Sequence, residues 1–206
     1  MRIAVINEVS ARDKNGMILA ALESTGAQIC NVGMSQSGPE PELTYIHTGL
    51  MAALALGAGA ADFVVGGCGT GQGFLISAMQ YPGVYCGLID NPLDAWLFSQ
   101  INAGNCVSLA LNKGFGWAGD INLRYLFDKL FCDAAGSGYP PHRSDSQRQS
   151  RNTIAGINKL AHNSMADIVR ALDPAILNAV KSHKPFVEFI EQFAGAGEFR
   201  ALLLSK

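Results

Sequence analysis

A thiol and a hydroxyl interrupt a run of glycines at residues 66–73. One glycine separates Cys68 from Thr70, and the segment joins an apolar run at residues 62–65 to a helical pattern that begins at Phe74. Glycine leaves backbone N–H groups open to a ligand, and the N-terminus of a helix adds a positive potential. The segment therefore predicts a loop that holds an oxyanion or a phosphate beside a thiol.

Such a loop supports proton transfer next to a carbonyl group. A helix N-terminus favours the thiolate form of cysteine, so we expect Cys68 to act as an acid–base group near neutral pH. The backbone N–H groups after Cys68 can hold the oxyanion that forms when a proton leaves the neighbouring carbon. The glycine spacing fits neither a dinucleotide-binding motif nor a P-loop. A tight strand-to-helix turn around a buried cysteine is the alternative interpretation.

Strand and helix patterns alternate along the first 132 residues. Short apolar runs predict strands at residues 3–6, 28–32, 63–65, 84–88 and 106–110. Helical spacing predicts helices at residues 14–24, 43–60, 74–80, 93–102 and 116–132. This alternation predicts a three-layer α/β/α, Rossmann-like fold around a five-stranded parallel sheet.

Ligands of such sheets bind at the carboxyl ends of the strands. The glycine loop lies at one of these ends, and Asp90 follows the fourth predicted strand. Asn7, Glu8 and Ser10 follow the first strand. Because a carboxylate at the end of a central strand is well placed for acid–base work, Glu8 is a candidate catalytic residue.

The chain changes character after residue 134. Glycines and prolines at residues 136–141 end the helical pattern, and a new helical pattern runs from Ser144 to the end. We therefore predict an α/β domain at residues 1–143 and a helical extension at residues 144–206. The extension is expected to pack on the sheet domain or on a partner subunit.

Composition narrows the class of protein. Of the 206 residues 49% are hydrophobic and 16% charged, which suffices for a substantial core, and the net charge of −2 gives no reason to expect nucleic acid or a membrane surface as partner. The uncharged stretch at residues 48–61 is shorter than a membrane span. The five cysteines show no metal-ligand spacing, which indicates a reduced, cytoplasmic protein with no metal site.

The segment from Cys68 to Gly73 resembles the Cys-Gly-Thr-Gly-Ile-Gly signature of the RpiB/LacA/LacB family of sugar-phosphate isomerases. Tyr45 resembles the tyrosine of that family's Asp-Tyr-Pro segment. Residues 82–84 resemble its Pro-Gly-Ile/Val turn, and residues 100–105 resemble its His-Asn-Asp-x-Asn segment. The resemblance covers about the first three quarters of the chain.

This resemblance implies a cofactor-free aldose–ketose isomerase that acts on a phosphorylated monosaccharide through a cis-enediolate. Cys68 would move the proton between C1 and C2, and Asn102 would complete the enediolate site. In the family that asparagine comes from a second subunit, which implies a homodimer or a dimer of dimers. Thr70 and the loop glycines would hold the sugar oxygens. The expected substrate-binding set is Asn7, Ser10, Tyr45, Gly69, Gly71, Gly73, Asn102, His142 and Arg143.

Two departures from the family pattern bear on the substrate. The family's Asp-His after the first strand is Glu8-Val9 here, and its histidine before the asparagine is Ile101. In the family the lost groups open the sugar ring and hold part of the phosphate. We therefore expect a substrate that is already open-chain, such as a tetrose or tetrulose phosphate. Alternatively, Glu8 transfers a proton to the ring oxygen.

The phosphate contact and the activity itself each leave alternatives. Arg143 follows a rigid Pro-Pro pair and is the first choice for a bidentate phosphate contact, with a surface role as the alternative. The rival functions are a non-catalytic sugar-phosphate-binding paralogue, a subunit of a hetero-oligomeric isomerase, and a covalent cysteine hydrolase. The hydrolase lacks an evident histidine partner for Cys68.

Overall fold

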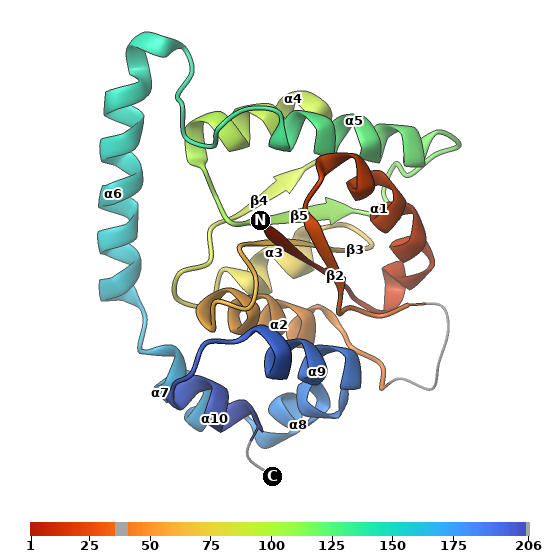
Figure 1. Cartoon of the computed structure of the whole chain (residues 1–206), viewed down its shortest axis with the longest axis vertical. Helices are drawn as coiled ribbons and strands as arrows, with labels where there is room; N and C mark the ends of the chain where they lie inside the picture. The colour runs from red at the N-terminus through yellow and green to blue at the C-terminus, as the bar shows by residue number, and fades with distance from the viewer. Residues whose placement is uncertain (36–40, 205–206) are drawn as a thin grey trace.

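A five-stranded parallel sheet forms the centre of the computed structural model, which describes residues 1–35 and 41–204 (Figure 1). The strand order is β2-β1-β3-β5-β4, and all four pairings are parallel. The strands are β1 (Arg2–Asn7), β2 (Gln28–Asn31), β3 (Phe63–Cys68), β4 (Cys86–Ile89) and β5 (Cys106–Ala110). The predicted three-layer fold is confirmed.

Helices cover both faces of the sheet because its central strands are apolar on both sides. In β1, Ala4 and Ile6 join one buried cluster, while Ile3 and Val5 join the other. The first face carries α2 (Tyr45–Gly57) and α3 (Gln72–Ala78). The second face carries α1 (Asn15–Leu22), α4 (Pro92–Leu97) and α5 (Gly119–Phe131).

The glycine segment is divided between a strand, a loop and a helix. The prediction that the third strand ends at residue 65 was wrong, since β3 continues through Cys68. A Cβ on Gly66 would lie 2.1 Å from the Phe74 ring, and one on Gly67 would lie 2.4 Å from the Leu109 carbonyl oxygen. These two glycines therefore permit close packing inside the sheet, and only residues 69–71 form the loop before α3.

Cys68 is thus the last residue of the central strand and lies at the carboxyl edge of the sheet. The opposite, amino edge receives the end of α4, which passes into a π-helical turn at Phe98–Asn102. That turn ends at Ala103 in the left-handed conformation, with φ of 46°, and the chain then enters β5. The predicted helix at residues 93–102 is therefore two helical segments.

The C-terminal part consists of an arm and a bundle. The arm is α6 (Ser144–Ala161), which stands beside the sheet domain and has no buried residue (Figure 1). The bundle comprises α7 (Met165–Ala171), α8 (Pro174–Ser182), α9 (Lys184–Phe193) and α10 (Glu198–Leu204). Bundle residues such as Val180 and Phe186 share the core of the α2 face. The domain boundary at residues 143/144 coincides with the start of α6 and stays a prediction.

Candidate active site

Cys68 and Thr70 lie next to each other at the carboxyl end of β3. The Cys68 Sγ atom is 4.0 Å from the Thr70 Oγ1 atom. Cys68 is only 5% exposed, whereas Thr70 is exposed. The Thr70 hydroxyl also accepts a bond from the Gln72 backbone N–H, at 3.4 Å. The thiol is therefore shielded from bulk solvent beside a hydroxyl that a ligand can reach.

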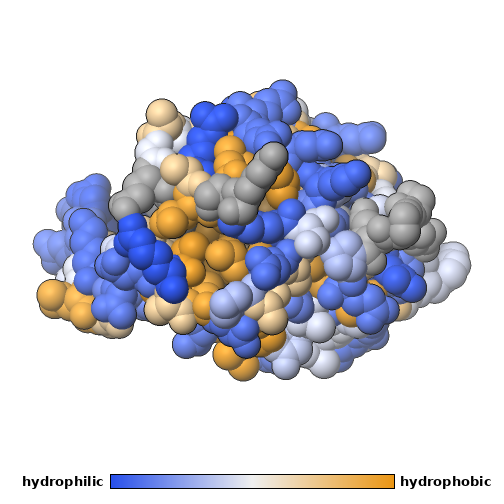
Figure 2. Space-filling model, turned by 90° about the horizontal axis from the view of Figure 1, so that it is seen from below, coloured by the Kyte–Doolittle hydropathy of each residue, from blue (hydrophilic) through white to orange (hydrophobic). Residues whose placement is uncertain are grey.

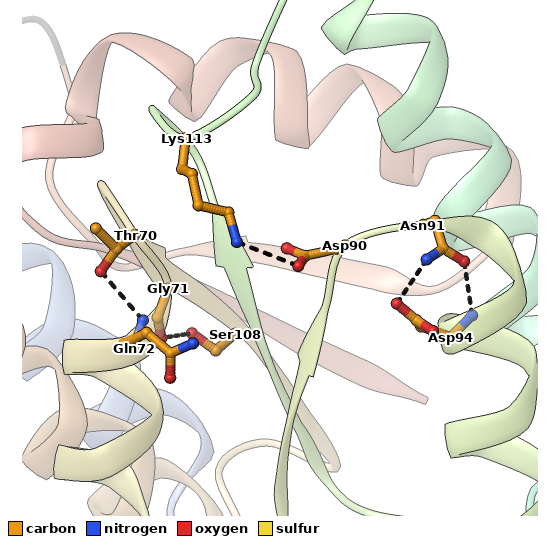
Figure 3. Close-up of polar contacts among 8 residues, drawn as sticks. All are labelled: Thr70, Gly71, Gln72, Asp90, Asn91, Asp94, Ser108 and Lys113. Carbon is orange, nitrogen blue, oxygen red and sulfur yellow. Dashed lines mark hydrogen bonds and ion pairs between the residues drawn. The ribbon is translucent and has the colours of Figure 1, made fainter.

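A buried serine supports the loop from below. Ser108, in β5, is completely buried, and its hydroxyl donates to the Gly71 carbonyl oxygen at 2.5 Å (Figure 3). Gly71 has φ of 74°, and a Cβ there would lie 2.5 Å from the Leu88 side chain. Sequence reasoning missed Ser108, although a lone polar residue in an apolar strand was a usable signal.

Tyr45 lies over the first turn of α3. A Cβ on Gly73 would be 2.8 Å from the Tyr45 ring, so this glycine lets the ring approach the helix. Tyr45 stays half-exposed at the carboxyl edge. Its neighbour His47 caps α2, where its Nδ1 accepts from the Thr44 N–H at 3.0 Å. His47 is therefore a capping residue, and burial lowers the pKa of its imidazole.

Glu8 and Ser10 reach the glycine loop through hydrogen bonds. The Ser10 hydroxyl donates to Glu8 Oε1, and the Ser10 N–H donates to the same oxygen at 3.1 Å. The Ser10 hydroxyl in turn accepts the Gly69 N–H at 3.1 Å. The structure thus joins two predicted site residues to the loop, and it engages the Gly69 N–H that was expected to face the sugar.

Asn112, a residue that sequence reasoning missed, closes this network from the segment after β5. Its side-chain amide donates to the Ser10 carbonyl at 2.9 Å. Its backbone N–H and that of Lys113 both donate to the Gly69 carbonyl at 2.9 Å. The segment after β5 therefore fixes both Ser10 and Gly69.

Asn7 lies under the edge rather than on it. It is completely buried, and its partner in β3 is Gly67. Neither atom of its side-chain amide has a hydrogen-bond partner within the described residues. Asn7 is therefore close to the loop in the sheet but has no contact with solvent.

A second group of polar residues lies at the ends of β4 and β5. Lys113 Nζ is 3.4 Å from Asp90 Oδ2, and both side chains are exposed (Figure 3). They border a pocket of about 480 Å³ between the two strand ends and the start of α5. The sequence had placed Asp90 at this edge but had given Lys113 no role.

Asn102, His142 and Arg143 lie at the amino edge, away from Cys68 of the same chain. Asn102 precedes β5, whereas the Cys68 partner Ala110 ends it. At about 3.3 Å per residue, the strand alone separates them by roughly 15 Å. The segment before α6 is tied to the same edge by a bond from the Gly138 N–H to the Gln100 carbonyl. One chain therefore does not bring these three residues to the thiol.

Cys86 and Cys106 are buried in the core, and the partly buried Cys30 packs against it. Burial raises the pKa of the Cys30 thiol, and burial together with the neighbouring Cys86 thiol raises the pKa of Cys106. These thiols stay protonated and apolar. Within residues 1–35 and 41–204, no cluster of three or more His, Cys, Asp or Glu side chains could hold a metal ion.

Comparison with models of protein families identifies the chain. Residues 3–124 match the family described as ribose/galactose isomerase. The chain belongs to this family. The prediction of an isomerase is confirmed, and the family assignment favours it over the binding protein and the cysteine hydrolase.

Two solved structures resemble this isomerase over nearly its full length. One is a 4-deoxy-L-threo-5-hexosulose-uronate ketol-isomerase complexed with a tartrate, with 38% identity and a TM-score of 0.94, covering 98% of this chain and 96% of that one. The other is a ribose-5-phosphate isomerase from Vibrio parahaemolyticus, with 39% identity and a TM-score of 0.95, covering 100% and 98%. Both matches include the helical extension.

A more distant structure shares the fold alone. It is a type B ribose 5-phosphate isomerase from Leishmania infantum, with 18% identity and a TM-score of 0.65, covering 78% of this chain and 98% of that one. No curated protein sequence matches the isomerase. In the part of the chain that the structure describes, no helix has the length and apolarity to cross a bilayer.

The isomerase departs from the family signature at two positions whose side chains cannot transfer protons. Val9 is half-buried against the α2-face core, and its N–H donates to the Leu43 carbonyl. Ile101 lies at the amino edge, where its carbonyl accepts from Arg151 at 2.8 Å. Both residues serve packing and backbone structure.

Proposed function

We propose that this protein is a cofactor-independent ketol-isomerase that converts an open-chain, anionic sugar through a cis-enediolate, with Cys68 as the base. The observation that carries the proposal is the contact of the Cys68 thiol with the Thr70 hydroxyl, 4.0 Å apart, at the carboxyl end of the central strand. Ligands of open α/β sheets bind at this edge.

The roles of the two residues follow from the charge that the reaction develops. Cys68 removes the proton from one carbon of the substrate and returns it to the neighbouring carbon. Because the thiol is only 5% exposed, water has little access to the intermediate that forms beside it. Thr70 faces solvent and can donate its hydroxyl proton to the enediolate oxygen. One such donor is typically worth about 3 kcal/mol in the transition state.

An open-chain substrate is favoured because the two positions at which the family pattern has histidines carry aliphatic residues here. Val9 and Ile101 cannot carry a proton, and Glu8 is buried behind the Ser10 hydroxyl that bonds its Oε1. A furanose such as ribose 5-phosphate requires proton transfer to its ring oxygen before isomerisation. An acyclic ketose avoids that step.

The substrate class that we favour is an acyclic uronate. A hexosulose uronate combines an open chain with a terminal carboxylate, and the uronate ketol-isomerase is similar to this chain over nearly its whole length. The tetrulose phosphate expected from the sequence shares both features, with a phosphate as the anion. Lys113 supplies a cation at the same edge, and its exposed pair with Asp90 is weak enough to exchange for a substrate anion.

We further propose that the active protein is a homodimer, in which the second copy brings Asn102, His142 and Arg143 to the thiol. The arm α6 supports this, since Ile154, Ile157 and Leu160 form an apolar stripe that is 52%, 57% and 90% exposed. Viewed from below, apolar side chains also gather on the surface over the C-terminal helices, beside the arm (Figure 2).

A pocket of about 420 Å³ gives the second copy a place to bind. It lies between α6 and the amino edge, and Phe98, Asn102 and Ile154 line it. Such a pocket, open beside the apolar stripe, suits burial of another chain's side chains.

Turnover of three substrates tests the substrate class. Conversion of a 4-deoxy-hexosulose uronate, tetrulose 4-phosphate and ribose 5-phosphate is followed by NMR at equal concentrations. We expect the uronate to have the highest kcat/KM and ribose 5-phosphate the lowest. Preference for the tetrulose phosphate would support the open-chain substrate and show that the anionic group is a phosphate and not a carboxylate. Efficient conversion of ribose 5-phosphate would contradict it.

A further inference from the structure

An aldose–ketose isomerisation moves two protons, and Cys68 accounts for only one. The carbon-bound proton passes between C1 and C2. A second proton must pass between O1 and O2, because the carbonyl group changes place. If the protein catalyses the proposed isomerisation, one of its groups must transfer this second proton.

Ser10 is the hydroxyl whose position suits this transfer. Its Oγ accepts the Gly69 N–H at 3.1 Å, so it lies at the peptide bond that joins Cys68 to Gly69. It also donates to Glu8 Oε1. Ser10 is exposed at the carboxyl edge, so a bound sugar can reach its oxygen.

Glu8 behind it is suited to take up the proton temporarily. The residue is only 4% exposed, and its Oε1 receives both the hydroxyl and the backbone N–H of Ser10. Water therefore has little access to Glu8, and Ser10 is the group through which it can exchange a proton with the site. A buried carboxylate that bonds a surface hydroxyl has the arrangement of a proton relay.

We propose that Ser10, backed by Glu8, transfers the oxygen-bound proton of the substrate. In the direction from ketose to aldose, Cys68 takes a proton from C1 while the O1 hydroxyl gives its proton to Ser10 Oγ. The original Ser10 proton passes to Glu8 Oε1. Glu8 then returns a proton through Ser10 to O2, and Cys68 returns its proton to C2. Both residues end as they began, and no other reactant takes part.

Asn112 is the positioning residue of this relay. Its amide donates to the Ser10 carbonyl at 2.9 Å, and its N–H donates to the Gly69 carbonyl at 2.9 Å. Asn112 therefore contacts both residues of the Ser10–Gly69 hydrogen bond and fixes the distance between them. Loss of its side chain would let Ser10 move relative to the thiol.

The relay is tested by comparing two rates in deuterium oxide. NMR measures solvent deuterium that enters recovered substrate and the product that forms from it. Without the relay, the enediolate still forms at Cys68, but it reverts to the substrate instead of being converted to the product. In Ser10→Ala and in Glu8→Gln, the ratio of exchange to product should therefore rise at least about tenfold. Ser10→Thr, which keeps a hydroxyl, should restore the wild-type ratio.

The Glu8→Gln variant keeps an oxygen that accepts from Ser10 but cannot take a proton, so it changes the relay with little change of shape. Ser24→Ala is the matched control, since Ser24 also bonds a carboxylate, that of Asp128 at 3.1 Å, away from the site. Its ratio should equal that of the wild type.

Equal loss of exchange and product in Ser10→Ala and Glu8→Gln would overturn the relay and leave only a structural role. If the wild-type protein exchanged no deuterium into any of the three substrates, the proposed isomerisation itself would fail. The two failures are therefore distinguishable.

Discussion

The Cys68 thiol and the Thr70 hydroxyl face each other at 4.0 Å across one glycine, the thiol shielded and the hydroxyl exposed. This pair divides the work of enolisation between a base and a hydrogen-bond donor. The division depends on the loop, which Ser108 and Asn112 hold from β5 and from the segment after it.

Removal of the Thr70 hydroxyl should slow the chemical step. We expect Thr70→Ala to lower kcat by about 10²–10³, because the developing enediolate loses a donor. KM should change much less, since the charge on the oxygen forms only in the transition state. Steady-state kinetics with the best substrate measures both values. Full activity of Thr70→Ala would exclude this role, and Thr70→Ser should recover most of the rate.

Loss of the positive charge at Lys113 should weaken substrate binding. Hydrogen bonds to charged groups are worth about 1.5–3 kcal/mol, so Lys113→Ala should raise KM at least about tenfold with a small change in kcat. Lys113→Arg should keep the wild-type KM within a few-fold. The same KM for Lys113→Ala and wild type would place the substrate anion elsewhere.

Gly71 should tolerate no side chain. Its φ of 74° and the 2.5 Å from a Cβ to Leu88 add a strained backbone to an atomic overlap. The backbone term alone is about 1–2 kcal/mol, and the overlap adds about 1–3 kcal/mol to the loss of unfolding free energy in Gly71→Ala.

Gly83→Ala separates these two effects. Gly83 has φ of 75°, but no heavy atom lies within 4 Å of a Cβ there. The free energy of unfolding of the Gly83→Ala variant should therefore fall only by the cost of the strained backbone. Urea denaturation measures both variants, and equal losses would show that Leu88 moves aside at no cost.

A charge on the apolar stripe of α6 should disrupt the dimer. Ile157 is 57% exposed within one chain, and we expect the second copy to bury it. Ile157→Glu should sediment as a monomer of 21.8 kDa, whereas Lys159→Glu, on another side of the helix, should remain dimeric. Monomeric wild-type protein at micromolar concentration would contradict the dimer.

The sequence sufficed for the layers of the fold because apolar runs of strand length alternate with helical spacing. It did not suffice for the end of β3, since Gly66 and Gly67 look like loop residues. A side chain at Gly66 would overlap Phe74, and one at Gly67 would overlap the backbone of Leu109. Leu109 lies 42 positions from Gly67 in the printed sequence. Contacts over such a separation leave no local pattern.

The same limit applies to the candidate site. Cys68, Thr70, Glu8 and Ser10 follow strands and were accessible to reasoning about strand ends, and the structure gathers them at one edge. Asn112 and Lys113 also follow a strand, but their polar types after β5 match an ordinary loop. Asn102 lies at the opposite edge, where only a resemblance, and not the local pattern, assigns it a role.

Solvent deuterium exchange with Cys68→Ala is the most direct test of the account. The wild-type protein and Cys132→Ala, which removes an exposed thiol away from the loop, should both exchange the C1 or C2 proton of an open-chain substrate. Cys68→Ala should reduce this exchange by at least about 10². Exchange at the wild-type rate in Cys68→Ala would show that another group is the base and would contradict the account.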